Sequence, residues 1–123
     1  MDLGCKLILE KFNFLEKAGF KCIINNPAGF VSIDYKYNNK FYIGIGTDYR
    51  EKTEYFAVVF PVPENEVVNY FYARPVYEFN IGTTEERKKL SELENTYENF
   101  KNVLDEYANF IEKNLNDIKK LAQ

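Results

Sequence analysis

This 123-residue chain contains no histidine, no tryptophan and only two serines, Ser32 and Ser91. Without histidine it has no Ser–His or Cys–His nucleophile pair, no histidine general base and no His-ligated metal site. The sequence also has no CxxC, no Walker A motif and no complete GxGxxG, because "GIG" (44–46) lies within a predicted strand. We therefore expect a protein that is not an enzyme and that uses no metal or cofactor.

One catalytic alternative needs only carboxylates. Asp34, Asp48, Glu51 and Glu54 are expected near one end of a sheet, and paired acids can perform acid–base chemistry when burial raises the pKa of one of them. Lysine and arginine residues are interleaved with these acids, a pattern that is also typical of ordinary surface charge.

Cysteines and long apolar runs are scarce as well. The two cysteines, Cys5 and Cys22, lie in apolar surroundings that favour small buried side chains over a disulfide framework. The opening "MDLGCKLILEKF" interleaves charges with apolar residues, unlike a signal peptide. No apolar run approaches the roughly 18 residues of a membrane span. These features predict a reduced, cytoplasmic protein that does not enter a membrane.

The charge balance is acidic and uneven. The net charge is −3, which argues against nucleic acid as the main ligand, because phosphate binding needs clustered Lys and Arg. Residues 1–60 carry 8 basic and 7 acidic residues, whereas residues 61–123 carry 8 and 12. The acidic half suits a basic partner, and the alternative interpretation is the solvated surface of helices.

Hydrophobic periodicity predicts a single α+β domain over residues 1–123. A helix is expected over 2–18, where apolar residues recur at helical spacing and Gly19 suits a left-handed C-terminal cap. The sheet region covers 20–80 as a four- to five-stranded antiparallel meander. Its first four strands are expected at 20–24, 30–37, 41–46 and 54–62.

The stretch 64–79 allows two interpretations. "ENEVVNYFY" favours a strand by its Val, Tyr and Phe content, and it could also form a short helix that begins near Pro63. Pro75 interrupts the stretch, and "VYEFNI" (76–81) is expected as a short edge strand, where proline is tolerated nearby.

The region 84–122 is expected to be helical. "TTEE" (83–86) predicts a capping box, with Thr83 as the N-cap and Glu86 at the third helical position. Apolar residues then recur in alternating steps of three and four, a heptad pattern: Leu90, Leu93, Tyr97, Phe100, Leu104, Tyr107 and Ile111. One straight helix of this length would overhang the sheet. It therefore either breaks near 94–96 into a hairpin, or it packs on the N-terminal helix and on another chain, as a homodimer through residues 90–121.

Alternation along the strands sorts the side chains onto two faces. The core face is expected to hold Val31, Ile33, Tyr35, Phe41, Ile43, Ile45, Phe56, Val58 and Phe60. On the other face Gly44 and Gly46 form a shallow floor, and glycine in a strand often marks a close approach by another group. Either the C-terminal helical region covers this second face or a partner binds there.

Aromatic residues are abundant, with ten Tyr and eleven Phe. Phe71 and Phe79 are expected in the core, whereas Tyr and Arg side chains dominate interface hot spots. We therefore predict a partner-binding surface made of Tyr42, Tyr49, Arg50, Tyr55, Tyr70, Tyr72, Arg74 and Tyr77.

These features together predict a non-enzymatic inhibitor that binds another protein. A small bacterial immunity or antitoxin-like protein, or a phage-encoded inhibitor, would block the functional surface of a basic toxin or a defence protein through complementary charge. Two alternatives are a small-ligand-binding domain with a Gly/Tyr-lined sheet face and a structural homodimer assembled through the heptad helix.

Overall fold

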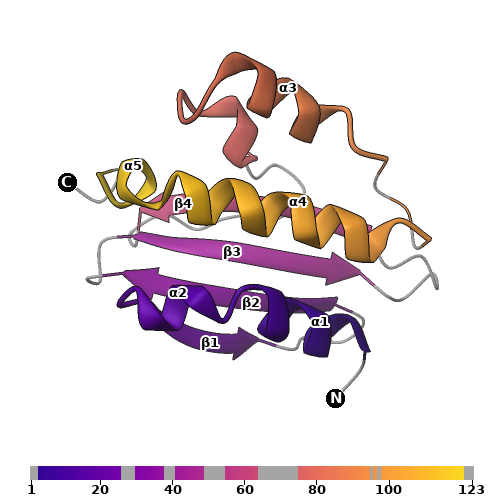
Figure 1. Cartoon of the computed structure of the whole chain (residues 1–123). Coiled ribbons are helices and arrows are strands. Elements are labelled where there is room, and N and C mark those ends of the chain that lie inside the picture. The colour runs from indigo at the N-terminus through magenta and orange to yellow at the C-terminus, as the bar shows by residue number, and fades with distance from the viewer. Residues whose placement is uncertain are drawn as a thin grey trace.

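The computed structural model describes residues 3–25, 30–37, 41–48, 55–63, 75–94, 96 and 98–120. Helices and an antiparallel sheet form an α+β fold, as the sequence predicts (Figure 1). The helices of residues 3–17 and those of residues 100–119 lie side by side on one of its faces. This layering decides which sheet surface is covered.

The strands follow each other in space as they do in sequence: β1 (Lys21–Asn25), β2 (Phe30–Tyr37), β3 (Phe41–Asp48) and β4 (Tyr55–Pro63). Each neighbouring pair is antiparallel. The sheet of described residues is therefore a meander with β1 and β4 at its edges. The possible fifth strand at 64–73 lies outside the described residues, so the number of strands stays a prediction.

The pairing of β3 with β4 is irregular. Ile45 lies opposite Val59, and two residues later Thr47 lies opposite Phe56, so β4 has one extra residue at this point. Such a bulge interrupts the alternation of the strand. The strict alternation that we used to sort Phe56 and Phe60 onto one face therefore does not hold across it.

The N-terminal helix is divided, where one continuous helix over 2–18 was expected. It consists of α1 (Leu3–Lys11) and α2 (Phe14–Lys17). Between them the backbone tightens to three-residue hydrogen bonds, from the N–H of Leu15 to the oxygen of Phe12 (3.0 Å) and from Glu16 to Asn13 (3.2 Å). The chain thus keeps its helical course through a local change of hydrogen bonding.

Gly19 ends α2 as predicted, with φ at +98°. The N–H of Phe20 donates to the oxygen of Leu15 (3.0 Å), and the N–H of Gly19 donates to that of Glu16 (3.2 Å). Both bonds belong to the Schellman motif. Leu15 and Phe20 are buried, which supplies the motif's usual hydrophobic contact.

The C-terminal region forms α3 (Thr84–Ser91), α4 (Phe100–Lys113) and α5 (Leu115–Lys119) rather than one long helix. The expected break lies in residues 92–99, where the Asn99 side-chain amide donates to the oxygen of Glu94 (2.8 Å). Asn side chains compete in this way with helical backbone bonds. The prediction of an edge strand at 76–81 is wrong. Pro75 is instead the N-cap of η2 (Val76–Glu78), a 3₁₀ turn.

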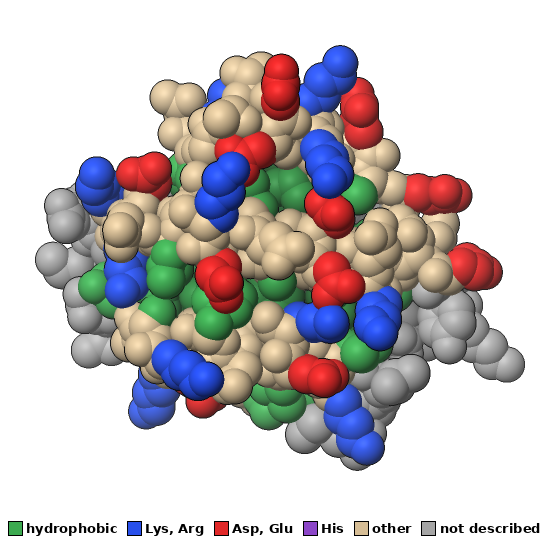
Figure 2. Space-filling model, viewed as in Figure 1, with side chains coloured by type: hydrophobic (Ala, Val, Ile, Leu, Met, Phe, Trp, Pro, Cys, Tyr) green, Lys and Arg blue, Asp and Glu red, His purple; other side chains and the backbone are tan. Residues whose placement is uncertain are grey.

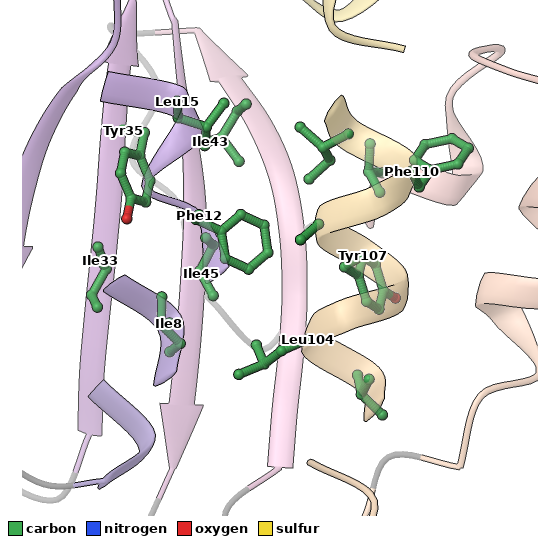
Figure 3. Packing of buried hydrophobic residues seen from close by; sticks show 14 of the residues in the cluster. Ile8, Phe12, Leu15, Ile33, Tyr35, Ile43, Ile45, Leu104, Tyr107 and Phe110 are labelled. Atoms are coloured by element: carbon green, nitrogen blue, oxygen red, sulfur yellow. The ribbon is translucent and has the colours of Figure 1, made fainter. Parts of the chain in front are cut away.

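The core lies between the sheet and the helical layer (Figure 3). Ile33, Tyr35, Ile43 and Ile45 are buried beneath the helices, which confirms the predicted core face for these four positions. The helices contribute Ile8, Phe12 and Leu15 on one side and Leu104 on the other, while Phe110 extends the core on the side of α4 away from the sheet. An ion pair between Lys11 Nζ and Asp105 Oδ1 (2.7 Å) joins α1 to α4.

Candidate interaction surfaces

Tyr77 is the only predicted partner-binding residue whose side chain the structure describes. Tyr42 and Tyr55 are placed by their backbones, in β3 and β4. The remaining members lie outside the described residues: Tyr49, Arg50, Tyr70, Tyr72 and Arg74. The predicted surface as a whole therefore stays a prediction.

Tyr77 lies in η2, half-buried against the hydrophobic core. Burial raises the pKa of its hydroxyl, and the charge of Glu78 adds to the increase. Burial also raises the pKa of Tyr107, with a further contribution from Tyr77. Phe79 is likewise half-buried against the core, as expected. Tyr77 thus lies at the edge of the core, with part of its side chain still exposed.

The side of the sheet away from the helices is called here the second face. Ile33 and Tyr35 point beneath the helices, so Asp34 and Lys36 project from the second face. Cross-strand register places Ile23 opposite Asp34 and Lys21 opposite Lys36 on the same face. Lys21 is exposed, and Ile23 and Lys36 are half-buried. Asp34 is only 8% exposed, and among the described residues it is the one charged side chain that is buried.

The predicted glycine floor continues this row of residues. Gly44 lies opposite Asp34 in the register, and Tyr42 lies opposite Lys36. Helices α4 and α5 lie on the same side of the sheet as α1 and α2 (Figure 1). The alternative that the C-terminal helices cover the second face is therefore wrong for the helices that the structure describes.

The structure places two carboxylate residues of the catalytic alternative, Asp34 and Asp48, and it keeps them apart. Asp34 is paired with Gly44, whereas Asp48 is paired with Phe30, four residues farther along the same two strands. At about 3.3 Å per residue, these rows are separated by about 13 Å. Glu51 and Glu54 lie outside the described residues. A dyad of Asp34 and Asp48 is therefore not formed.

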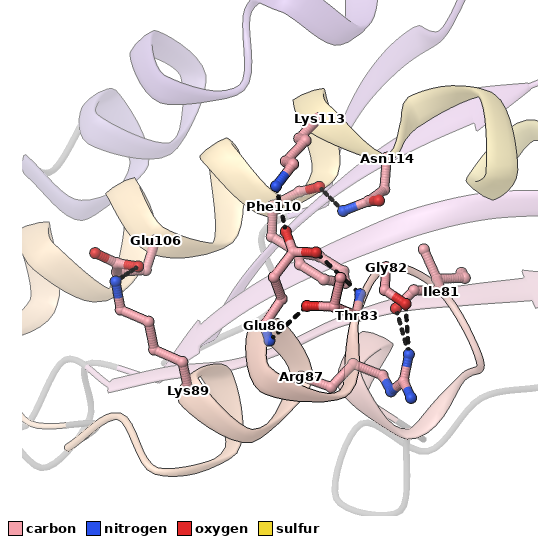
Figure 4. A network of polar contacts seen from close by, with 10 residues as sticks. All are labelled: Ile81, Gly82, Thr83, Glu86, Arg87, Lys89, Glu106, Phe110, Lys113 and Asn114. Atoms are coloured by element: carbon pink, nitrogen blue, oxygen red, sulfur yellow. Dashed lines mark hydrogen bonds and ion pairs between the residues drawn. The ribbon is translucent and has the colours of Figure 1, made fainter.

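A small groove lies between α3 and α4, with a volume of about 150 Å³. Leu90 and Phe110 form its apolar floor, and Asn109 also lines it. Two ion pairs cross it, Lys89 Nζ to Glu106 Oε2 (3.1 Å) and Lys113 Nζ to Glu86 Oε2 (3.2 Å) (Figure 4). Higher numbers on α3 face lower numbers on α4, so the helices are antiparallel. We call this surface the α3–α4 groove.

Glu86 links this groove to the start of α3. Its Oε1 accepts a hydrogen bond from the N–H of Thr83 (2.9 Å), and its own N–H donates to Thr83 Oγ1 (3.1 Å), which confirms the predicted capping box. The bond from the Thr83 backbone, followed by the contact with Lys113, lowers the pKa of the Glu86 carboxyl. The polar rim of the groove is therefore engaged in holding α3 against α4.

Arg87 fixes the segment that leads into α3. Its Nη1 donates to the oxygens of Ile81 (2.9 Å) and Gly82 (2.8 Å), and its Nη2 donates to Thr84 Oγ1 (3.3 Å). We did not predict the groove or this contact from the sequence. The sequence does contain a signal for the groove. Charged residues flank the apolar stripe at helical spacing, Glu86 with Lys89 and Glu106 with Lys113.

Charge on the helical side of the molecule is mixed. Figure 2 shows blue and red side chains interspersed over this face, with apolar side chains between them. An acidic patch suited to a basic partner is therefore not seen on the viewed side. Among the described residues, no group of three or more His, Cys, Asp or Glu side chains could share a metal ion. None of the described helices has both the length and the apolar character that a bilayer crossing needs.

Comparisons with protein families, with curated proteins and with solved structures found no match to this chain.

Proposed function

We propose that this protein is a non-enzymatic binding protein that engages another protein through its second face. One observation carries the proposal: α1, α2, α4 and α5 pack on one side of the sheet, while Lys21, Ile23 and Lys36 project from the other side. An antiparallel sheet with one face on the core can offer its other face to a partner. Half-buried and exposed side chains on a rigid sheet form a preorganised surface, which lowers the entropic cost of binding.

The charges of this face indicate the kind of contact. Lys21 and Lys36 lie directly opposite each other on neighbouring strands, and like charges in this arrangement are destabilising. An acidic segment of a partner would relieve that repulsion. The contact surface that we propose for the partner is therefore acidic, in contrast to the basic partner suggested by the charge of residues 61–123.

The more specific proposal is inhibition. A binding protein of this size can block the functional surface of a toxin or of a defence protein, in the manner of an immunity protein, an antitoxin-like protein or a phage-encoded inhibitor. Such blocking needs a rigid surface and no chemistry, which is consistent with the lack of histidine and with the separation of Asp34 from Asp48.

The test is a cross-linked pull-down from the source cells, followed by titration of the purified partner in a calorimeter. We expect Lys36→Glu to weaken binding at least about tenfold, because it reverses one of the two opposed positive charges of the second face. Lys101→Glu makes the same charge change at an exposed position of α4, on the other side of the sheet. This control variant should bind like the wild type.

Equal affinity of the Lys36→Glu variant and the wild type would show that the second face is not the binding surface. Loss of binding in the Lys101→Glu variant alone would move the surface to the helical side. If the partner's activity is unchanged when the complex forms, inhibition is contradicted, whereas the proposal of a binding protein still holds.

A further inference from the structure

The outer edge of β1 is the most exposed apolar feature of the described chain. β1 is the first strand of the sheet, and its paired neighbour is β2. Ile24 is 46% exposed, and among the described residues it is the one large hydrophobic side chain that is exposed. An edge strand presents backbone N–H and C=O groups that can pair with a further strand.

The two edges of the sheet differ in how they are protected. β4 contains Pro61 and Pro63 and has a register shift against β3, and both features discourage pairing with another strand. β1 has the sequence KCIIN, without proline, and all five of its residues pair with β2 in one uninterrupted register. Its only charge, Lys21, lies at its first position. β1 therefore lacks the features that protect β4.

The sequence of β1 is complementary to itself. In an antiparallel pair of two copies centred on Ile23, Lys21 of each copy lies opposite Asn25 of the other, and Cys22 lies opposite Ile24. No like charges are opposed in this register, and such opposition is the main electrostatic obstacle to strand pairing. Each exposed Ile24 would lie beside a half-buried Cys22, on the helical side of the sheet.

We propose that a second copy of this chain binds at the outer edge of β1, in an antiparallel β1–β1 pair around a two-fold axis at Ile23. The two sheets then form one continuous sheet, and each Ile24 is covered. A two-fold interface uses the same surface patch on both copies, and the register above meets that condition. A five-residue strand offers few hydrogen bonds, so the dimer is weak, with a dissociation constant above about 1 μM.

This interface differs from the homodimer predicted through residues 90–121. Within that range Phe100, Leu104, Tyr107, Ile111 and Ile118 are at most 5% exposed, buried in the chain's own core. A second chain could reach these side chains only if α4 and α5 left the sheet. The β1 edge needs no such rearrangement.

The first test is sedimentation velocity of the full chain over a range from about 1 μM to about 1 mM. We expect a monomer–dimer equilibrium for the wild type. Ile24→Lys places a charge on the pairing edge and should weaken the dimer at least about tenfold. Asn102→Lys adds the same charge at an exposed position of α4 and should leave the equilibrium unchanged. Circular dichroism of each variant reports whether it is folded.

The second test determines the register by oxidative cross-linking in a Cys5→Ala/Cys22→Ala background. Ile23→Cys places two thiols directly opposite each other across the two-fold axis, within reach of a disulfide. Lys21→Cys places its two thiols four residues apart along the strands, about 13 Å, which is too far. We expect a covalent dimer from the first variant and monomer from the second.

Three results would overturn the proposal. The wild type could remain monomeric at every concentration, or the Ile24→Lys variant could dimerise as well as the wild type. The Lys21→Cys variant could also cross-link where Ile23→Cys does not, which would locate the dimer contact elsewhere. If the wild type stays monomeric and β1 instead binds a strand of a different protein, the proposed dimer is likewise overturned.

Discussion

Among the described residues, two glycines adopt positive φ, and their surroundings differ. At Gly19 (φ +98°) an added Cβ would lie 3.7 Å from Tyr37 Cε1, which is an ordinary contact. At Gly82 (φ +69°) it would lie 2.9 Å from Phe110 Cε2 and 3.1 Å from Asn114 Nδ2. The first glycine is required by backbone conformation alone. The second is required both by conformation and by the close approach of the α3 connection to α4.

We predict that Gly82→Ala destabilises the protein more than Gly19→Ala. Left-handed backbone conformation costs a residue with a Cβ about 1–2 kcal/mol, so Gly19→Ala should lower the free energy of unfolding by about that amount. Gly82→Ala adds overpacking against Phe110, for a total of about 2–4 kcal/mol. Urea unfolding of both variants measures the difference. Equal losses would mean that the α3 connection shifts to accommodate the methyl group.

The Glu86 carboxyl makes stability depend on pH. Its pKa is lowered in the folded protein by the Thr83 N–H and by Lys113, so its contribution is present above the ordinary glutamate pKa of about 4.3. The contribution is lost as the pH falls through the lowered folded pKa. We predict that Glu86→Gln is less stable than the wild type at neutral pH and that the difference disappears in acid.

Urea unfolding of the wild type and the Glu86→Gln variant, from neutral pH to about pH 2, measures this dependence. Glu85→Gln removes the same charge from the neighbouring exposed position and is the control. A difference between Glu86→Gln and the wild type that is constant over this range would contradict the assignment.

At the scale of elements, the sequence correctly predicted which heptad positions of α4 are buried. It did not show what these positions pack against. The heptad positions Phe100, Leu104, Tyr107 and Ile111 are buried as predicted. Three further residues of α4 are buried too: Val103, Ala108 and Phe110. The apolar stripe is thus broader than a coiled-coil seam, because α4 packs on the sheet and also contacts the α3 region through Phe110. Sequence spacing alone does not distinguish such a stripe from a coiled-coil seam.

The start of α3 is defined by a local signal, which can be tested directly. Thr83→Ala removes the N-cap oxygen that accepts the Glu86 N–H, and we expect it to lower the free energy of unfolding by about 1 kcal/mol. Thr83→Ser keeps the hydroxyl and should lose much less. Chemical unfolding at neutral pH compares the three proteins. A Ser variant as unstable as the Ala variant would show that the threonine methyl group, rather than its hydroxyl, stabilises this helix end.

At the scale of the whole molecule, α1, α2, α4 and α5 form one layer on the sheet, and α3 lies beyond β4, beside α4 (Figure 1). α3 has one buried residue, Leu90, whereas α4 has seven. The contacts that hold α3 are mainly polar: the two ion pairs of the α3–α4 groove and the bonds of Arg87. Stability is therefore expected to be uneven across the helices.

We predict that α3 opens before the rest of the fold. Segments with little buried apolar surface open with lower free energies than the core. Hydrogen exchange followed by mass spectrometry should show faster exchange in residues 84–91 than in 100–113, and added salt should widen the gap by screening the exposed ion pairs. Equal protection of the two helices would mean that α3 unfolds only together with the core.

The sequence by itself determined the elements that depend on local chemistry. The Gly19 cap, the Thr83–Glu86 capping box, the strand positions and the burial of Ile33, Tyr35, Ile43 and Ile45 follow from backbone conformation, side-chain caps and alternation, which act over a few residues. Only the tertiary structure decided that α1, α2, α4 and α5 share one face of the sheet, opposite the second face with Lys21, Asp34 and Lys36. That choice depends on packing between segments far apart in sequence, and no local pattern encodes it.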